Sequence, residues 1–110
     1  MIATKELIEI RTLTPEEALR QLGDTADEVA ESLRRAGCRG YTASAHGCPV
    51  ARYMQGLGFK GFQVGASGYY RGPGHMGVMS AKGHNARGVG EFILRFDRGE
   101  YPDLEKSSYP

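Results

Sequence analysis

Residues 85–99 read Asn-Ala-Arg-Gly-Val-Gly-Glu-Phe-Ile-Leu-Arg-Phe-Asp-Arg-Gly, and this stretch carries the clearest helical pattern in the chain. Its apolar side chains recur at i, i+3, i+4 and i+7, the spacing of one helix face. They are Val89, Phe92, Ile93 and Phe96. Asn85 is expected to cap this helix and Gly99 to end it. The sequence therefore predicts a C-terminal helix that buries one face in a core, with Tyr101 and Leu104 packing back beyond it.

Three further helices are predicted upstream. Thr14-Pro15-Glu16-Glu17 and Thr25-Ala26-Asp27-Glu28 both match the capping box that begins a helix. Gly37 suits the left-handed residue that ends the second of these helices. Pro49 fits the first position of a third helix, expected over 49–57.

The remaining segments predict a small antiparallel sheet. Residues 6–13 favour a short strand, with a helix as the alternative, and residues 62–64 and 77–80 favour two more strands. The glycine- and proline-rich connection over 68–74 is expected to turn sharply at the surface. The predicted fold is α+β, with about four helices and two to three antiparallel strands. The compact domain is expected over 1–104, with a loose tail over 105–110.

Length and composition exclude several classes of protein. The chain has 110 residues, of which 40% are hydrophobic and 25% charged, which suits one globular domain. It contains no apolar run long enough for a transmembrane helix. The first residues include Glu6 and lack an apolar segment, so no secretory signal is expected. Two cysteines do not make a disulfide framework, and the expected location is the cytoplasm.

Charge is distributed unevenly along the chain. Residues 1–31 carry a net charge of −5, residues 32–90 carry +8 without a single acid, and residues 91–110 carry −2. The same central stretch holds 14 of the 16 glycines, which indicates turns and close backbone approaches. Such an acid-free stretch favours an anionic partner. In the alternative interpretation, the acidic N-terminal helices fold over the basic centre and neutralise it.

The order of helix, loop, helix and glycine-rich ribbon is also that of a winged helix-turn-helix. In that arrangement the basic side chains reach phosphates, and Tyr69 and Tyr70 at the ribbon tip stack on bases or sugars. The candidate basic residues are Arg34, Arg35, Arg39, Arg52, Lys60, Arg71, Lys82 and Arg87. The third helix offers few base-reading side chains, so phosphate contact is favoured over sequence reading.

Cysteine and histidine residues suggest two alternatives. Cys48 precedes the third helix, where the helix dipole lowers a thiol pKa, and His46 lies two residues earlier as a possible base. No carboxylate to orient that histidine is identifiable nearby. Candidate zinc ligands are Cys38, His46, Cys48, His75 and His84, but their spacing lacks the usual ligand pairs. Structural packing of both cysteines is the competing interpretation.

Three stretches carry a resemblance to a known group of proteins. They are Gly37-Cys38-Arg39-Gly40, Cys48-Pro49-Val50-Ala51-Arg52-Tyr53, and residues 96–104, Phe-Asp-Arg-Gly-Glu-Tyr-Pro-Asp-Leu. Together they resemble small uncharacterised proteins of actinobacteria and their phages. The resemblance implies a bacterial or phage cytoplasmic origin and a compact single domain, and it brings no activity and no catalytic residue.

The sequence thus predicts a small non-enzymatic binding module without a cofactor, whose basic centre engages an anionic macromolecule, nucleic acid above all. One alternative is an interaction module that docks on an acidic protein surface, such as a phage- or element-encoded modulator of a host protein. Another is a cysteine-dependent enzyme or a small zinc protein that uses Cys48 and His46.

Overall fold

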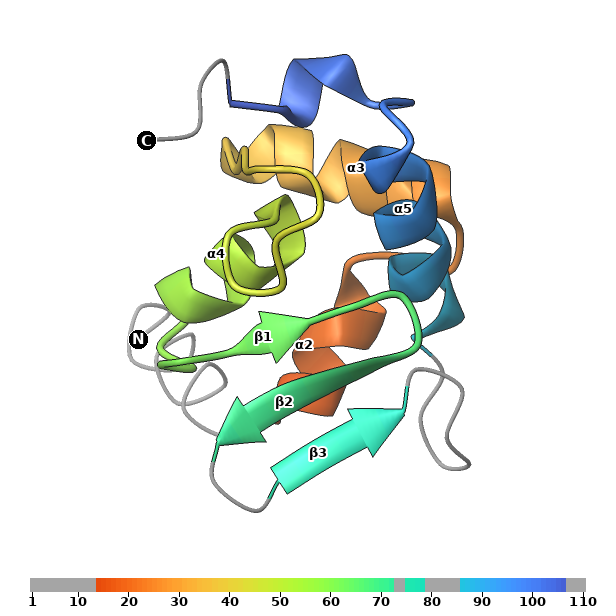
Figure 1. Ribbon diagram of the computed structural model, residues 1–110. Helices are drawn as coiled ribbons and strands as arrows, with labels where there is room; N and C mark the ends of the chain where they lie inside the picture. Colours follow the sequence, from red (N-terminus) through yellow and green to blue (C-terminus); the bar gives the residue numbers. More distant parts are fainter. Residues whose placement is uncertain (1–13, 73–74, 79–85, 107–110) are drawn as a thin grey trace, which may run out of the picture.

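The computed structural model describes residues 14–72, 75–78 and 86–106 (Figure 1). Four α-helices, three strands and one 3-10 helix follow one another along these residues, which confirms the predicted α+β class. They are α2 (Pro15–Gln21), α3 (Ala26–Ala36), α4 (Pro49–Gly56), β1 (Gln63–Val64), β2 (Gly68–Gly72), β3 (His75–Val78), α5 (Arg87–Asp97) and η1 (Pro102–Leu104). The strand expected over 6–13 lies outside the described residues. None of the described helices is long and apolar enough to span a membrane.

Local side-chain chemistry begins and ends the first helices as predicted. Thr14 caps α2 and Thr25 caps α3, because each Oγ1 accepts a hydrogen bond of 3.2 Å from the backbone N–H three residues on. The reciprocal bond of the second capping box is shifted by one residue, since Glu28 Oε1 accepts from the N–H of Asp24 at 2.8 Å. Gly37 ends α3 with φ of 69°, the left-handed conformation that glycine adopts without strain.

Helix α5 begins one residue later than the sequence suggests. Ala86 occupies the N-cap position and makes no side-chain capping bond, and Asn85 lies outside the described residues. Gly88 in the first turn lies against the backbone that joins α2 to α3, where an added Cβ would be 2.7 Å from Gly23 O. Because glycine occupies this position, α5 can approach the α2–α3 connection closely.

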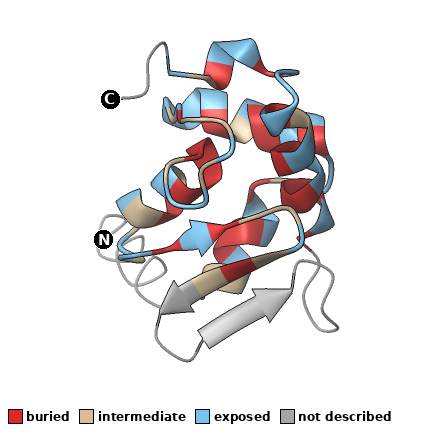
Figure 2. Cartoon of the chain, in the orientation of Figure 1, coloured by how far each residue is buried: buried red, intermediate tan, exposed pale blue. Residues whose placement is uncertain are grey.

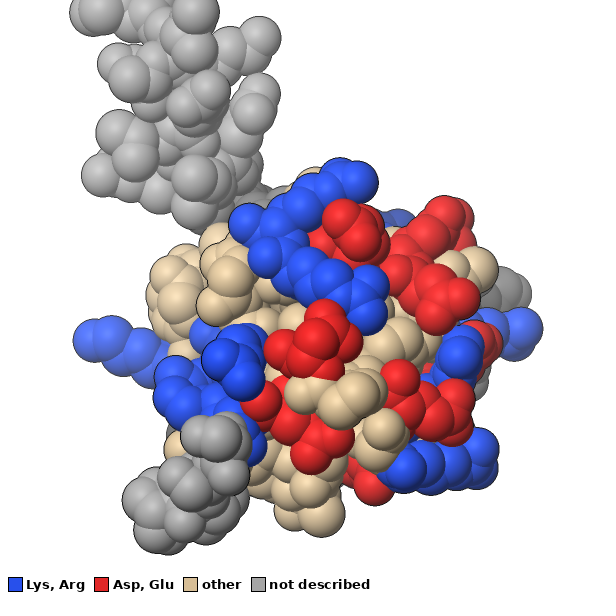
Figure 3. All heavy atoms as spheres, turned by 90° about the horizontal axis from the view of Figure 1, so that it is seen from above, with Lys and Arg blue, Asp and Glu red and all other residues tan. Residues whose placement is uncertain are grey.

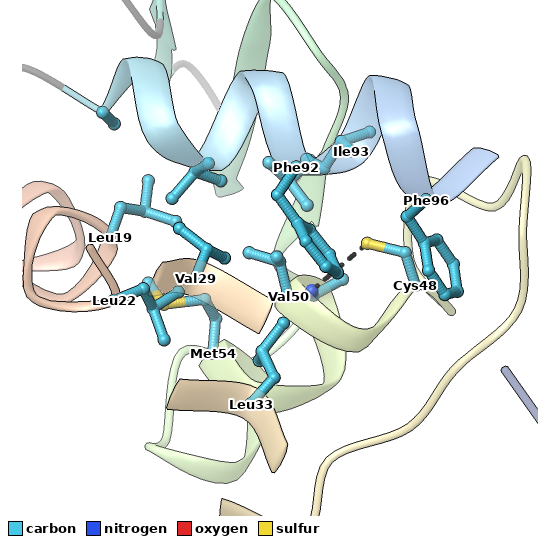
Figure 4. Close-up of a cluster of buried hydrophobic side chains, with 14 of the residues drawn as sticks. Leu19, Leu22, Val29, Leu33, Cys48, Val50, Met54, Phe92, Ile93 and Phe96 are labelled. Atoms are coloured by element: carbon cyan, nitrogen blue, oxygen red, sulfur yellow. Dashed lines mark hydrogen bonds between the residues drawn. The ribbon is translucent and has the colours of Figure 1, made fainter. Parts of the chain in front are cut away.

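The core lies between the helices and the inner face of the sheet. Helices α3 and α5 pack against each other, α2 contacts both α4 and α5, and α4 contacts β1. Figure 4 shows side chains of α2, α3, α4 and α5 meeting at the centre of this cluster. The buried residues gather on the inward sides of these elements, whereas their outer sides are exposed (Figure 2). The predicted apolar face of α5 is confirmed, since Val89, Phe92, Ile93 and Phe96 are all buried.

The sheet has three antiparallel strands in the order β1-β2-β3. Its middle strand runs through residues that the sequence analysis assigned to a surface turn, and that assignment is wrong for 68–72. Tyr69 pairs with Val64 on one side and Gly77 on the other, and the register shifts between Tyr70 and Gly72. The many glycines suggested a turn, yet the backbone of this stretch forms ladder hydrogen bonds on both sides.

The C-terminal segment packs back on the helices. Tyr101 is buried and its ring stacks on Phe92, with 5.1 Å between ring centroids, and Leu104 is buried nearby. Ordered pairing continues into the expected tail, because Glu105 and Gly40 form a parallel bridge and Lys106 N donates to Gly40 O at 2.9 Å. Backbone pairing thus extends to Lys106, two residues beyond the boundary expected after residue 104.

Candidate anion-binding site

Gly40 brings together three segments that are distant in the sequence. Its N–H donates to Leu104 O and its carbonyl accepts from Lys106 N, each at 2.9 Å, which fixes the C-terminal segment beside it. A Cβ at this position would lie 2.5 Å from Pro49 N and 2.6 Å from Cys48 C. Glycine is therefore required for the segment after α3 to lie against the start of α4.

A pocket of about 270 Å³ opens where these three segments meet. Its lining residues are Gly37, Cys38, Arg39, Arg52 and Lys106. Three of the five are cations, and each comes from a different segment: the turn after α3, helix α4 and the residues after η1. None of the lining residues is acidic, so the pocket concentrates positive charge.

Contacts within the protein position two of the three cations and leave their charge available. Arg39 Nη2 donates to the backbone carbonyl of Glu105 at 2.8 Å, which orients the guanidinium without neutralising it. The Lys106 ammonium lies 5.9 Å from the centroid of the Tyr41 ring, within the range of a cation–π contact. Among the described residues, no ion pair joins Arg39, Arg52 or Lys106 to a carboxylate.

Cys38 contributes a half-buried thiol to the same pocket. Burial raises the pKa of Cys38 above its ordinary value, while the positive charge of Arg52 acts in the opposite direction. The thiol is therefore largely protonated at neutral pH and forms a small, uncharged part of the pocket wall.

Two of the other predicted basic residues form ion pairs at the end of α3. Arg34 forms an ion pair with Asp103 at 2.5 Å between Nε and Oδ2, and this hydrogen bond raises the arginine pKa and lowers that of Asp103. Arg35 pairs with Glu31 at 3.4 Å. Arg34 and Arg35 at the end of α3 are thus paired with carboxylates, whereas the charge of Arg39 acts on Asp103 without an ion pair and lowers the pKa of that carboxyl.

The remaining cations do not join the pocket lining. Lys60 is exposed in the turn that follows α4, and Arg87 is exposed at the first residue of α5. Arg71 lies on β2, and Lys82 falls outside the described residues. Of the predicted basic residues that the structure describes, Arg39 and Arg52 line this pocket.

Tyr69 does not lie at a ribbon tip and is not available for stacking on a base. It is 4% exposed, its ring stacks on Phe62 with 5.8 Å between centroids, and its hydroxyl donates to Glu16 Oε2 at 2.7 Å. Tyr70 points to the other side of β2 and is half-buried. Alternation along a strand explains the difference, since successive side chains point to opposite faces.

Cys48 is a capping and packing residue rather than an activated thiol. It is 2% exposed, and its Sγ accepts a hydrogen bond of 3.4 Å from Ala51 N, drawn as a dashed line in Figure 4. Burial raises its pKa to about 11, which reverses the predicted lowering by the helix dipole. His46 is exposed nearby. The competing interpretation, a thiol that packs beneath the start of α4, agrees with this geometry.

No cluster of three or more metal-ligating side chains is found within residues 14–72, 75–78 and 86–106. Cys38 and Cys48 are both free thiols in the structure. Of the other zinc candidates, His75 lies on β3 and His84 falls outside the described residues.

Lys106 is the site residue that sequence reasoning missed. Lys106 was not predicted because it lies in a segment that was expected to be loose. The backbone hydrogen bond that holds it to Gly40 does not depend on side-chain type, so no sequence pattern indicates it. The space-filling view shows acidic and basic side chains interleaved over much of the face that it presents (Figure 3).

Comparison of the chain with protein-family models, with curated proteins and with solved structures finds no match. What the pocket can bind is therefore judged from its own residues.

Proposed function

We propose that this protein is a nucleic-acid-binding module that holds phosphate groups in the pocket between Arg39, Arg52 and Lys106. The observation that carries the proposal is the convergence of three cations from three segments on one pocket whose lining contains no acid. Nucleic acid presents a dense and regular array of phosphates, and phosphate contacts dominate its affinity for proteins.

The geometry supports phosphate contact better than sequence reading. Arg39 and Arg52 offer planar guanidinium groups, which match phosphate oxygens in pairs, and Lys106 adds a compact point charge. Helix α4 carries Arg52 and Gln55, and the amide of Gln55 already donates to the carbonyls of His46 and Phe62. The amide nitrogen of Gln55, which could otherwise contact a base edge, is thus occupied within the protein.

A second polar pocket of the described residues contrasts with this one. It is larger, about 410 Å³, but both signs of charge line it, including Arg20, Arg35, Asp24 and Glu28. Opposite charges within one pocket reduce its attraction for a polyanion. The pocket around Arg52 is the better candidate because its charges all have the same sign.

The proposal is tested by binding of the purified, nuclease-treated protein to fluorescent single- and double-stranded DNA and RNA over a salt series. Three cations neutralise at most about three phosphates, so the slope of log affinity against log salt should be no steeper than about −2.7 for duplex DNA and about −2 for a single strand. Arg52→Ala should weaken binding and reduce the steepness of that slope by about 1.

Arg98→Ala is the matched control, because it removes one charge from an exposed arginine outside the pocket. It should leave the affinity nearly unchanged. A flat salt response, or equal losses for Arg52→Ala and Arg98→Ala, contradicts the proposal. If poly-glutamate of the same charge displaces the fluorescent oligonucleotide as well as unlabelled nucleic acid does, the pocket instead binds an acidic protein surface.

A further inference from the structure

We infer that the pocket binds a phosphate monoester at the end of a nucleic-acid strand, in preference to the internal phosphodiesters along it. This inference rests on the proposed function, and it names the chemical group that the pocket selects. It follows from the number of cations, from the size of the pocket and from the way its walls are built.

The number of cations exceeds what one internal phosphate needs. A phosphodiester carries a single negative charge, whereas a phosphate monoester carries about −1.5 to −2 at neutral pH and has three acceptor oxygens. Arg39, Arg52 and Lys106 together bring three positive charges to one pocket. A surface that follows a strand would instead spread its cations along successive phosphates.

The size and shape of the pocket favour a single terminal group. Its volume of about 270 Å³ is just below the range of about 300–1,000 Å³ that is typical of sites for drug-sized ligands. Its walls come from three sides, with Cys38 and Arg39 after α3, Arg52 on α4 and Lys106 in the C-terminal segment. The nucleic-acid strand must leave the pocket on both sides of an internal phosphate, whereas it leaves on one side only from a terminal phosphate.

The available donors also fit a group with several free oxygens. Arg39 uses Nη2 on the carbonyl of Glu105 and keeps its other N–H groups for a ligand. The side chain of Arg52 makes no hydrogen bond to another residue in the described part of the chain, and only its backbone N–H is used, on the carbonyl of Cys48 at 3.0 Å. Gly37, at the rim, has no side chain, and a Cβ built there meets nothing within 4 Å, so the entrance beside it is open.

The test compares oligonucleotides of one sequence that end in a 5′-phosphate, a 3′-phosphate or a hydroxyl at both ends. At a pH well above the second phosphate pKa of about 6, a monoester end should tighten binding by about tenfold. The advantage should shrink as the pH falls below that pKa, because the monoester then carries the same charge as a diester. Arg52→Ala should abolish the preference, and Arg98→Ala should preserve it.

Cys38 supplies a second readout at the pocket itself. Its half-buried thiol should react slowly with iodoacetamide, and the buried Cys48 should react more slowly still, which provides an internal reference. The phosphorylated oligonucleotide should slow alkylation of Cys38 at a concentration at which the hydroxyl-ended one does not. Inorganic phosphate and a nucleoside monophosphate are tested alone as competitors, to separate a strand end from a small phosphate ligand.

The outcomes separate this inference from the proposed function. Equal, salt-sensitive binding of phosphorylated and hydroxyl-ended strands overturns the inference and leaves nucleic-acid binding intact. Binding of no strand overturns both. Protection of Cys38 by inorganic phosphate alone, without any gain from an attached strand, supports a monoester pocket but contradicts its use on nucleic acid.

Discussion

Replacement of Gly40 by alanine should both destabilise the fold and dismantle the pocket. The added Cβ would lie 2.5–2.6 Å from backbone atoms of Cys48 and Pro49, which cannot rotate aside as a side-chain end would. Overpacking of this kind costs about 1–3 kcal/mol. The backbone shift that relieves this overlap would also strain the two hydrogen bonds of Gly40, to Leu104 and Lys106. Each such bond contributes about 0.5–1.5 kcal/mol to the free energy of unfolding. We expect Gly40→Ala to lower the free energy of unfolding by about 3 kcal/mol.

The matched control is Gly56→Ala. Gly56 is exposed at the last residue of α4, and a Cβ there meets nothing within 4 Å. Alanine is the better helix former, so this variant should gain about 0.4–1 kcal/mol. Urea unfolding followed by circular dichroism measures both variants. Since a domain of this size has about 5–15 kcal/mol of stability, Gly40→Ala should still be folded without denaturant.

Equal stability of the two glycine variants would refute the close packing that we describe around Gly40. The binding assay adds a second comparison on the folded proteins. Because Gly40 holds the segments of Arg39, Arg52 and Lys106 together, Gly40→Ala should weaken oligonucleotide binding, whereas Gly56→Ala should leave it unchanged. Unaltered binding by a destabilised Gly40→Ala would place the ligand elsewhere.

Two further predictions concern stability. Burial, together with the hydrogen bond to Asp27, raises the pKa of Tyr101 to about 12, against an ordinary value of about 10. The unfolded chain therefore loses this proton first, so stability should fall as the pH rises from about 10 to about 12. Tyr101→Phe should remove part of that fall in alkaline urea titrations, and an unchanged profile would contradict it. Thr25→Ala should cost about 1 kcal/mol at neutral pH, measured by thermal or urea unfolding, because α3 loses its cap; a loss below about 0.3 kcal/mol would show that water replaces the hydroxyl.

Local signals predicted the helices well because each signal acts within one turn. Thr14, Thr25 and Gly37 lie at helix ends where the hydrogen bonds and the left-handed backbone were expected. The apolar stripe of α5 was equally clear, since burial follows directly from its 3.6-residue spacing. The sheet was harder to predict, because glycines along 68–72 concealed the alternation that places Tyr69 inside and Tyr70 on the other face.

The candidate site depends on contacts between distant residues, which the sequence does not reveal. Arg34 looked equivalent to Arg39 in the charge map, yet Arg34 forms an ion pair with Asp103, whereas Arg39 donates to a backbone carbonyl and acts on Asp103 only through its charge at longer range. The two environments differ because the C-terminal segment places the carboxylate of Asp103 beside Arg34 and the carbonyl of Glu105 beside Arg39. Charge distribution therefore predicted an anionic partner, whereas the choice of cations required the three-dimensional structure.

The hydrogen bond from Arg39 to Glu105 spans 66 positions of the chain, and this long separation bears on the order of folding. Bringing such distant residues together costs loop entropy that the capped helices, formed from neighbouring residues, do not incur. The pocket should therefore be completed late, after α3 and α4 have already packed. A ligand that binds only the completed pocket stabilises the native state by mass action. Tighter phosphate binding should therefore raise the free energy of unfolding of the protein.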